Sequence, residues 1–92
     1  MNTIKINELF EEYKTGSKAA KDKLVLAFTP ICKKIALRYK GLNIDTFELQ
    51  QEGVLGIYAA LERYSDAYDC SLETYVSRRI FTVVDEFVLL NM

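Results

Sequence analysis

The hydrophobic and polar positions along the chain repeat with helical spacing, and no period-two strand pattern is sustained anywhere. A short amphipathic helix is predicted over residues 4–13, with an apolar side formed by Ile6, Leu9, Phe10 and Tyr13. A longer apolar pattern covers residues 18–39, with Ser17 as a natural N-cap and Gly41 as a natural stop. Pro30 interrupts this pattern, which predicts either a kink in one long helix or the start of a second one.

The second half of the chain contains two further helix signals. In "NIDTFE", Asp45 and Glu48 have the spacing of a capping box, and the helix that follows runs to about Arg63. A polar, aromatic-rich turn, "YSDAYDC", leads to Ser71, which caps a last helix over residues 72–90. The apolar stripe predicted for that helix is Leu72, Val76, Ile80, Val83 and Phe87. Together the patterns predict an all-α fold, a compact bundle of four to five helices in one domain spanning residues 1–92.

The helix containing "ELQQEGVLGIYAALERYS" has two glycines in its interior, and each costs about 1 kcal/mol relative to alanine. Helical geometry puts these small residues on one stripe, which consists of Leu49, Gly53, Gly56, Ala60 and Tyr64. A stripe of this kind allows a neighbouring backbone to approach closely, and the close packing can offset the propensity cost. We therefore interpret both glycines as structural.

The opposite side of the same helix mixes polar and apolar groups. It carries Glu48, Gln51, Glu52, Leu55 and Tyr58. Such a mixture is typical of binding surfaces, while the pattern alone is equally met by an ordinary solvated face.

Composition narrows the function classes. The chain has no histidine, no Gly-rich phosphate loop and no thiolate cluster, so we expect neither an enzyme nor a metal or cofactor site. Cys32 and Cys70 stand apart and are expected to be free thiols. Because no signal peptide opens the chain and no apolar run reaches membrane-spanning length, we expect a cytoplasmic protein.

Charge is segregated along the chain although the net charge is only −1. Residues 1–40 hold nine Lys/Arg against four Asp/Glu, a net +5, whereas residues 41–92 hold three against nine, a net −6. The second half therefore presents either an acidic docking surface or a solvated acidic face.

Two stretches of the second half of the sequence resemble a known family. "FELQQEGVLGIYAALERYS" and "SLETYVSRRIFTVVDEF" are similar to the second conserved region of bacterial sigma factors of the primary-type (sigma-seventy) family. The family pattern there is an acidic residue, Leu, any residue and Gln-Glu-Gly, followed later by Phe-x-Thr-Tyr-Ala. Upstream, "LVLAFTPICKKIALRYKGLNID" resembles the opening helix of that region, so the resemblance covers residues 8–88.

The resemblance implies a compact helical domain that docks on the clamp helices, a coiled coil of the β′ subunit of bacterial RNA polymerase. Carried over by position, the docking residues are Glu48, Gln51, Glu52, Val54 and Tyr58. Carboxylates and an amide suit the arginines that clamp helices present.

The resemblance also implies contact with the minus-ten promoter element, on its non-template strand, where aromatic side chains stack on unpaired bases. The matching positions are Tyr64, Tyr75, Arg78, Arg79 and Thr82. Two alternatives stay open: the tyrosines pack in the core with exposed hydroxyls, and the arginines form ion pairs with Glu73, Asp85 or Glu86.

Several positions depart from the family pattern. Leu72 stands where Phe is usual, Ser71 where a basic residue is common, and Phe81 where Arg is common, while Tyr68-Asp69 replaces an Arg-Gly-like pair. Loss of an aromatic or basic group weakens single-strand binding, since stacking alone contributes about 1–3 kcal/mol per base.

The sequence contains no match to the helix-turn-helix domain that reads the minus-thirty-five element in this family. The chain is then either an excised fragment or a stand-alone region-two protein. In the second case we expect a second polypeptide to supply that domain, as in two-subunit sigma systems. Two competing hypotheses remain: a regulator that uses the docking face without melting DNA, of the co-sigma or anti-sigma type, and a helical interaction module without a link to polymerase.

Overall fold

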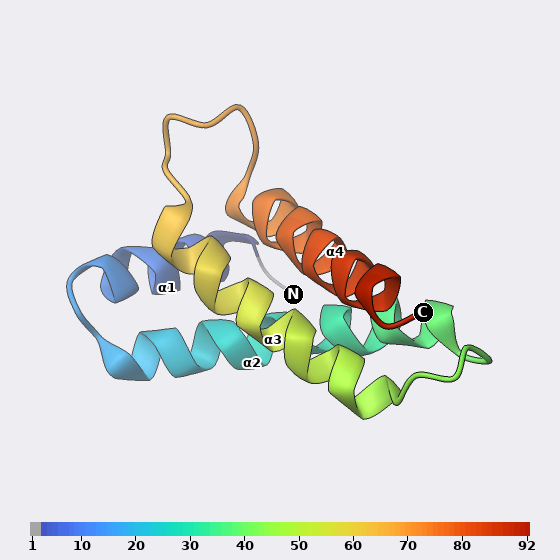
Figure 1. Ribbon diagram of the computed structural model, residues 1–92. Coiled ribbons are helices and arrows are strands. Elements are labelled where there is room, and N and C mark those ends of the chain that lie inside the picture. The colour runs from blue at the N-terminus through green and yellow to red at the C-terminus, as the bar shows by residue number, and fades with distance from the viewer. Residues whose placement is uncertain (1–2) are drawn as a thin grey trace.

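Four α-helices and one short 3-10 turn form the protein in the computed structural model, which describes residues 3–92 (Figure 1). The helices are α1 (Thr3–Lys14), α2 (Lys18–Ala36), α3 (Thr46–Arg63) and α4 (Leu72–Leu90), and the 3-10 turn η1 (Leu37–Tyr39) extends α2. No strand occurs within this described range. The all-α prediction of four to five helices is confirmed.

The helices form a layered bundle in which α3 contacts both α2 and α4. The most extensive interface joins α3 to α4, which run antiparallel side by side, and α2 packs against both of them (Figure 1). α1 packs on α2. The loop between α3 and α4 extends beyond the ends of these two helices (Figure 1). No helix in the described part of the chain is both long enough and apolar enough to cross a membrane.

Side-chain caps begin three of the helices where the sequence predicted them. The Ser17 hydroxyl accepts the Ala20 amide at 3.1 Å, and the Ser71 hydroxyl accepts the Thr74 amide at 3.1 Å. At the start of α3 the Asp45 carboxylate accepts the Phe47 amide at 2.8 Å. The capping-box spacing had pointed to the amide one residue further on, so the cap is present but bonded one position earlier.

The helix α2 continues through Pro30 as one element and ends at Ala36. This settles the two alternatives in favour of a single helix. Proline supplies no N–H to the preceding turn, and in that turn the Thr29 hydroxyl donates to the Val25 carbonyl at 2.7 Å. After η1, Gly41 adopts a φ of +101°, a conformation that side chains with a Cβ rarely adopt, and so ends the helical run.

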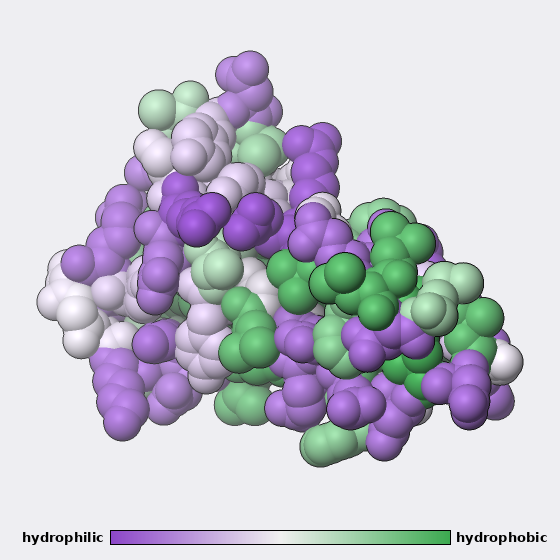
Figure 2. All heavy atoms as spheres, in the orientation of Figure 1, coloured by the Kyte–Doolittle hydropathy of each residue, from purple (hydrophilic) through white to green (hydrophobic). Residues whose placement is uncertain are grey.

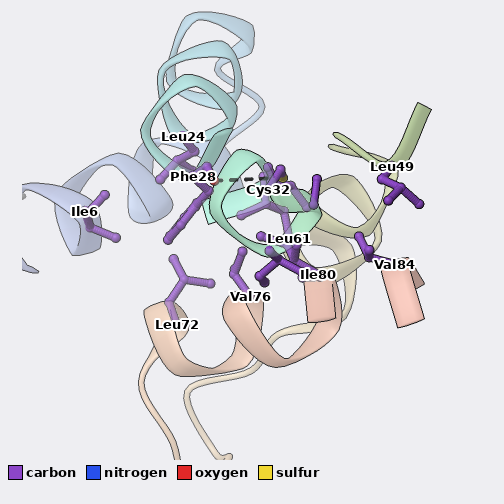
Figure 3. Packing of buried hydrophobic residues seen from close by; sticks show 14 of the residues in the cluster. Ile6, Leu24, Phe28, Cys32, Leu49, Leu61, Leu72, Val76, Ile80 and Val84 are labelled. Atoms are coloured by element: carbon purple, nitrogen blue, oxygen red, sulfur yellow. Dashed lines mark hydrogen bonds between the residues drawn. The ribbon is translucent and has the colours of Figure 1, made fainter. Parts of the chain in front are cut away.

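The core lies between all four α-helices and includes Ile6 and Phe10 of α1, and Phe28 of α2 points towards α4 (Figure 3). The buried stripe of α4 differs from the prediction in its second half. It consists of Leu72, Val76, Ile80, Val84 and Val88. The predicted Val83 and Phe87 are only partly buried. Residues four apart advance by about 40° around a helix. When every buried residue follows the last by four positions, the buried stripe gradually rotates from one neighbouring helix towards the other. A sequence pattern that assumes one apolar face cannot show that α4 packs against two helices.

The two glycines of α3 lie at its contacts with α2 and α4, as predicted. A Cβ added to Gly53 would lie 2.9 Å from both Cβ and Sγ of Cys32, closer than such atoms approach. A Cβ on Gly56 would lie 3.4 Å from the Arg79 carbonyl oxygen and from the Ile80 Cα, backbone atoms of α4. Only Gly53 therefore requires the absence of a Cβ, whereas Gly56 lies at an ordinary contact distance from α4. The inner side of α3 is thus packed against α2 and α4, and its other side forms a surface.

Both cysteines are free, as predicted, and they have different environments. Cys32 is fully buried, and its thiol donates to the Phe28 carbonyl at 3.9 Å (Figure 3). Burial raises the pKa of the Cys32 thiol to about 11. Its side chain therefore acts as a small apolar group of the core.

Candidate functional site

The outer side of α3 forms a hollow that joins acidic, amide and aromatic groups. We call it the acidic hollow, and it is lined by Phe47, Glu48, Gln51, Glu52, Leu55 and Phe87. Three of the five predicted docking residues, the two glutamates and the glutamine, are therefore neighbours on one surface. The polar groups come from two successive turns of α3.

The aromatic and aliphatic members of the acidic hollow are unusually open. Phe47 is 63% exposed and Leu55 is 60% exposed, and Phe87 reaches the same hollow from α4. Figure 2 shows apolar side chains gathered over the C-terminal part of α4 and the adjoining part of α3. A polar rim around an apolar centre is the composition of a protein-binding surface.

The sequence analysis missed Phe47 and Phe87 as members of this surface. Phe47 lies two residues after the Asp45 cap, so the position of the cap could have marked it as lying on the first, open turn of α3. Phe87 was instead assigned to the buried stripe of α4.

Val54 and Tyr58 are not among the residues that line the acidic hollow. Val54 is partly buried and packs against the core. Tyr58 is half-buried, with the Lys21 ammonium of α2 at 5.1 Å from its ring centroid. Because Tyr58 lies seven positions after Gln51, it continues the same stripe of α3 beyond the hollow, at the border with α2.

Tyr64 and Tyr75 belong to an aromatic cluster at the base of the α3–α4 loop. Tyr64 lies 5.5 Å from Phe10 and 5.6 Å from Tyr75 between ring centroids, and Tyr68 lies 5.4 Å from Tyr75. Both predicted tyrosines are half-buried and pack against the core. Tyr68, which is 46% exposed, is the most open ring of the cluster.

Polar contacts hold the α3–α4 loop against this cluster. The Tyr64 hydroxyl donates to the Cys70 carbonyl at 2.8 Å, and burial followed by the nearby Asp66 raises the pKa of Tyr64. The Lys14 ammonium at the end of α1 lies 3.3 Å from the Asp66 carboxylate. Tyr64 therefore closes the loop with its hydroxyl, which limits its freedom to stack on a base.

Arg78 and Thr82 line a second hollow, between α2 and α4. We call it the basic hollow, and its lining is Ile35, Arg38, Ser77, Arg78, Phe81 and Thr82. The Arg38 guanidinium lies 5.8 Å from the centroid of the Phe81 ring. The Thr82 hydroxyl donates to the Arg78 carbonyl at 2.9 Å, within the helix.

The sequence analysis did not select Arg38, and it treated Phe81 only as the loss of an arginine. The structure puts a guanidinium beside the Phe81 ring from another helix. The two residues lie far apart in the sequence, so no local motif could have paired them.

Arg79 is separate from the basic hollow. Its side chain is half-buried, and its Nε atom is buried without a hydrogen-bond partner in the described chain. Within residues 3–92, neither Arg78 nor Arg79 forms an ion pair with Glu73, Asp85 or Glu86. Asp85 instead accepts the Tyr39 hydroxyl at 3.0 Å.

A helical domain with one acidic and one basic, aromatic hollow is equipped for binding. Comparison with known families identifies its class: a family model described as Sigma-70 region 2 matches residues 24–83, and the chain belongs to this family. Membership supports a sigma-factor-like role in transcription initiation, and the family consists of non-enzymatic domains whose general partners are RNA polymerase and promoter DNA. No curated protein and no solved structure gave a match.

Proposed function

We propose that the acidic hollow docks on the β′ clamp helices of bacterial RNA polymerase. The observation that carries this proposal is the juxtaposition of Glu48, Gln51 and Glu52 in one hollow with two exposed apolar side chains, Phe47 and Leu55. Arginines of the clamp would meet the carboxylates in charge-assisted hydrogen bonds. Apolar side chains of the coiled coil would cover Phe47 and Leu55, which removes their surface from water.

Promoter contact is the second part of the proposal, on the α4 side of the domain. Tyr75, Arg78 and Thr82 are its central residues. Arg38 and Phe81 join them because they share the basic hollow with Arg78 and Thr82. The arginines would hold phosphates and the open rings would stack on unpaired bases of the minus-ten element. Tyr64 supports the α3–α4 loop through its hydrogen bond to the Cys70 carbonyl. The half-buried guanidinium of Arg79 would add a further contact to the promoter DNA.

The helices of residues 3–92 form this one bundle and hold no second DNA-reading domain. We propose that a domain of a second polypeptide makes the contact with the minus-thirty-five element.

A binding titration with the purified clamp-helix fragment of β′ tests the docking. We expect saturable binding by the wild type. For Glu52→Arg we expect a dissociation constant at least about tenfold higher, since the substitution puts like charges together in the interface. Glu8→Arg is the matched control, because it makes the same charge change on an exposed position of α1. Equal binding by all three proteins, or none by any, would overturn the docking proposal.

One observation favours a second candidate function, a regulator that docks without melting DNA. Leu72, where the family usually has Phe, is buried in the core and presents no ring for stacking. The neighbouring loop carries Asp66 and Asp69, which repel phosphates. Promoter opening followed with a fluorescent base in the minus-ten element distinguishes the two: Tyr75→Ala reduces opening if the domain melts DNA, and changes nothing if it only docks.

A further inference from the structure

A third surface groove lies between α1 and α2, apart from both hollows described above. It is lined by Lys5, Ile6, Leu9, Lys23, Leu26 and Ala27. None of these residues belongs to α3 or α4. The groove therefore remains available when the other two surfaces are occupied.

The floor of the groove is apolar and open. Leu26 is 71% exposed although it lies in the middle of a long helix, and Leu9 is half-buried beside it. A single exposed leucine is ordinary on a protein surface. Here, however, Leu26 joins Leu9 and Ala27 in one continuous lining, which is the form of a site for an apolar partner.

The rim of the groove is basic. Lys5 and Lys23 are both exposed, and neither forms an ion pair within residues 3–92. Lys33 and Lys34 are exposed further along the same helix, in a half of the chain with a net charge of +5. A partner for this groove must therefore combine apolar side chains with carboxylates.

We infer that the groove binds an acidic amphipathic helix of a partner protein. An apolar stripe at helical spacing would cover Leu9, Leu26 and Ala27, and flanking Asp or Glu side chains would pair with Lys5 and Lys23. A nucleic acid fits less well, because the lining has no aromatic ring on which a base could stack and its floor is apolar where phosphates need donors. The site is independent of polymerase docking, so a regulatory partner could bind the domain while it is engaged elsewhere.

The test uses a designed probe and resonance mapping on the ¹⁵N-labelled protein. The probe is a blocked peptide of about 16 residues, long enough to populate a helix, with leucines on one stripe and glutamates on both sides of it. A second peptide has lysine in place of every glutamate, and a third has the same composition in scrambled order. We expect the acidic peptide alone to bind, with its largest shift changes at residues of the groove.

Leu26→Asp and Lys23→Glu should each weaken binding of the acidic peptide, by at least about tenfold for Leu26→Asp. Both positions are exposed, so the variants keep the fold, which circular dichroism checks. Leu89→Asp is the matched control, since Leu89 is 65% exposed at the other end of the chain, and it should bind like the wild type.

Four results would overturn the inference. They are shift changes outside the groove, equal binding by the lysine or scrambled peptide, occupation of the groove by a single-stranded oligonucleotide, and a concentration-dependent dimer that Leu26→Asp disperses. The last would make a second copy the occupant.

Discussion

At the scale of single residues, Gly53 is the position on which the docking helix depends. No larger residue fits beside Cys32, because a Cβ at position 53 would lie 2.9 Å from two of its side-chain atoms. The sequence predicted this packing role, since two glycines inside a helix carry a propensity cost that only close approach offsets. It could not predict which neighbour makes the contact, because Cys32 lies on a different helix.

Gly53→Ala should lower the free energy of unfolding by up to about 2 kcal/mol. The steric cost of overpacking, about 1–3 kcal/mol, exceeds the gain in helix propensity of about 1 kcal/mol. Gly56→Ala is the control: its Cβ would meet α4 at 3.4 Å, an ordinary contact, so its stability should equal or exceed that of the wild type. Urea denaturation measures both, and equal stability of the two variants would contradict the packing described here.

Because Cys32 is buried, we predict that the free energy of unfolding decreases at alkaline pH. Its folded-state pKa is raised from 9.0 to about 11, so between these pH values the unfolded chain loses a proton that the folded chain keeps. The stabilising contribution is thus complete below pH 9 and is lost as the pH rises towards 11. The full shift corresponds to at most about 3 kcal/mol.

Urea denaturation of wild type, Cys32→Ala and Cys70→Ala at a series of pH values measures this effect. The decline should be shallower in Cys32→Ala and unchanged in Cys70→Ala. It should not vanish, because burial also raises the pKa of Tyr13, Tyr39 and Tyr64, which adds a loss of the same sign above about pH 10. Identical slopes in all three proteins would contradict the assignment to Cys32.

At the scale of elements, helix ends were more predictable than helix faces. Ser17, Asp45 and Ser71 cap their helices through bonds to residues two or three positions away, so a short stretch of sequence contains the whole interaction. The buried face of α4 depends on both α2 and α3, so Val84 and Val88 replaced the predicted Val83 and Phe87. The same reason applies to the basic hollow, where Arg38 and Phe81 meet only in the folded chain.

The Ser71 cap should stabilise α4, and with it the surface that carries Tyr75 and Arg78. Ser71→Ala removes the acceptor for the Thr74 amide and should lower the free energy of unfolding by about 1 kcal/mol. Ser77→Ala in the interior of the same helix is the control, since alanine is the better helix former there. A thermal or urea melt compares them, and a Ser71→Ala protein as stable as the control would contradict the capping role.

At the scale of the whole molecule, the bundle separates its surfaces by charge and by helix. The acidic hollow lies on α3 with one ring from α4, the basic hollow lies between α2 and α4, and the α1–α2 groove lies apart from both. The sequence predicted the acidic side of α3 from its spacing. It did not predict the contribution of Phe87, because that residue enters the hollow from a second helix.

A charge-exchange titration tests the central claim, that Glu52 meets clamp arginines in the docked complex. Glu52→Arg and the wild type are each titrated with the native clamp-helix fragment and with a fragment in which arginines of its docking face are changed to glutamate. The account predicts that each single change weakens binding and that the two together restore it by at least about tenfold over either alone. Independent, additive losses would contradict it, because Glu52 would then lie away from those arginines.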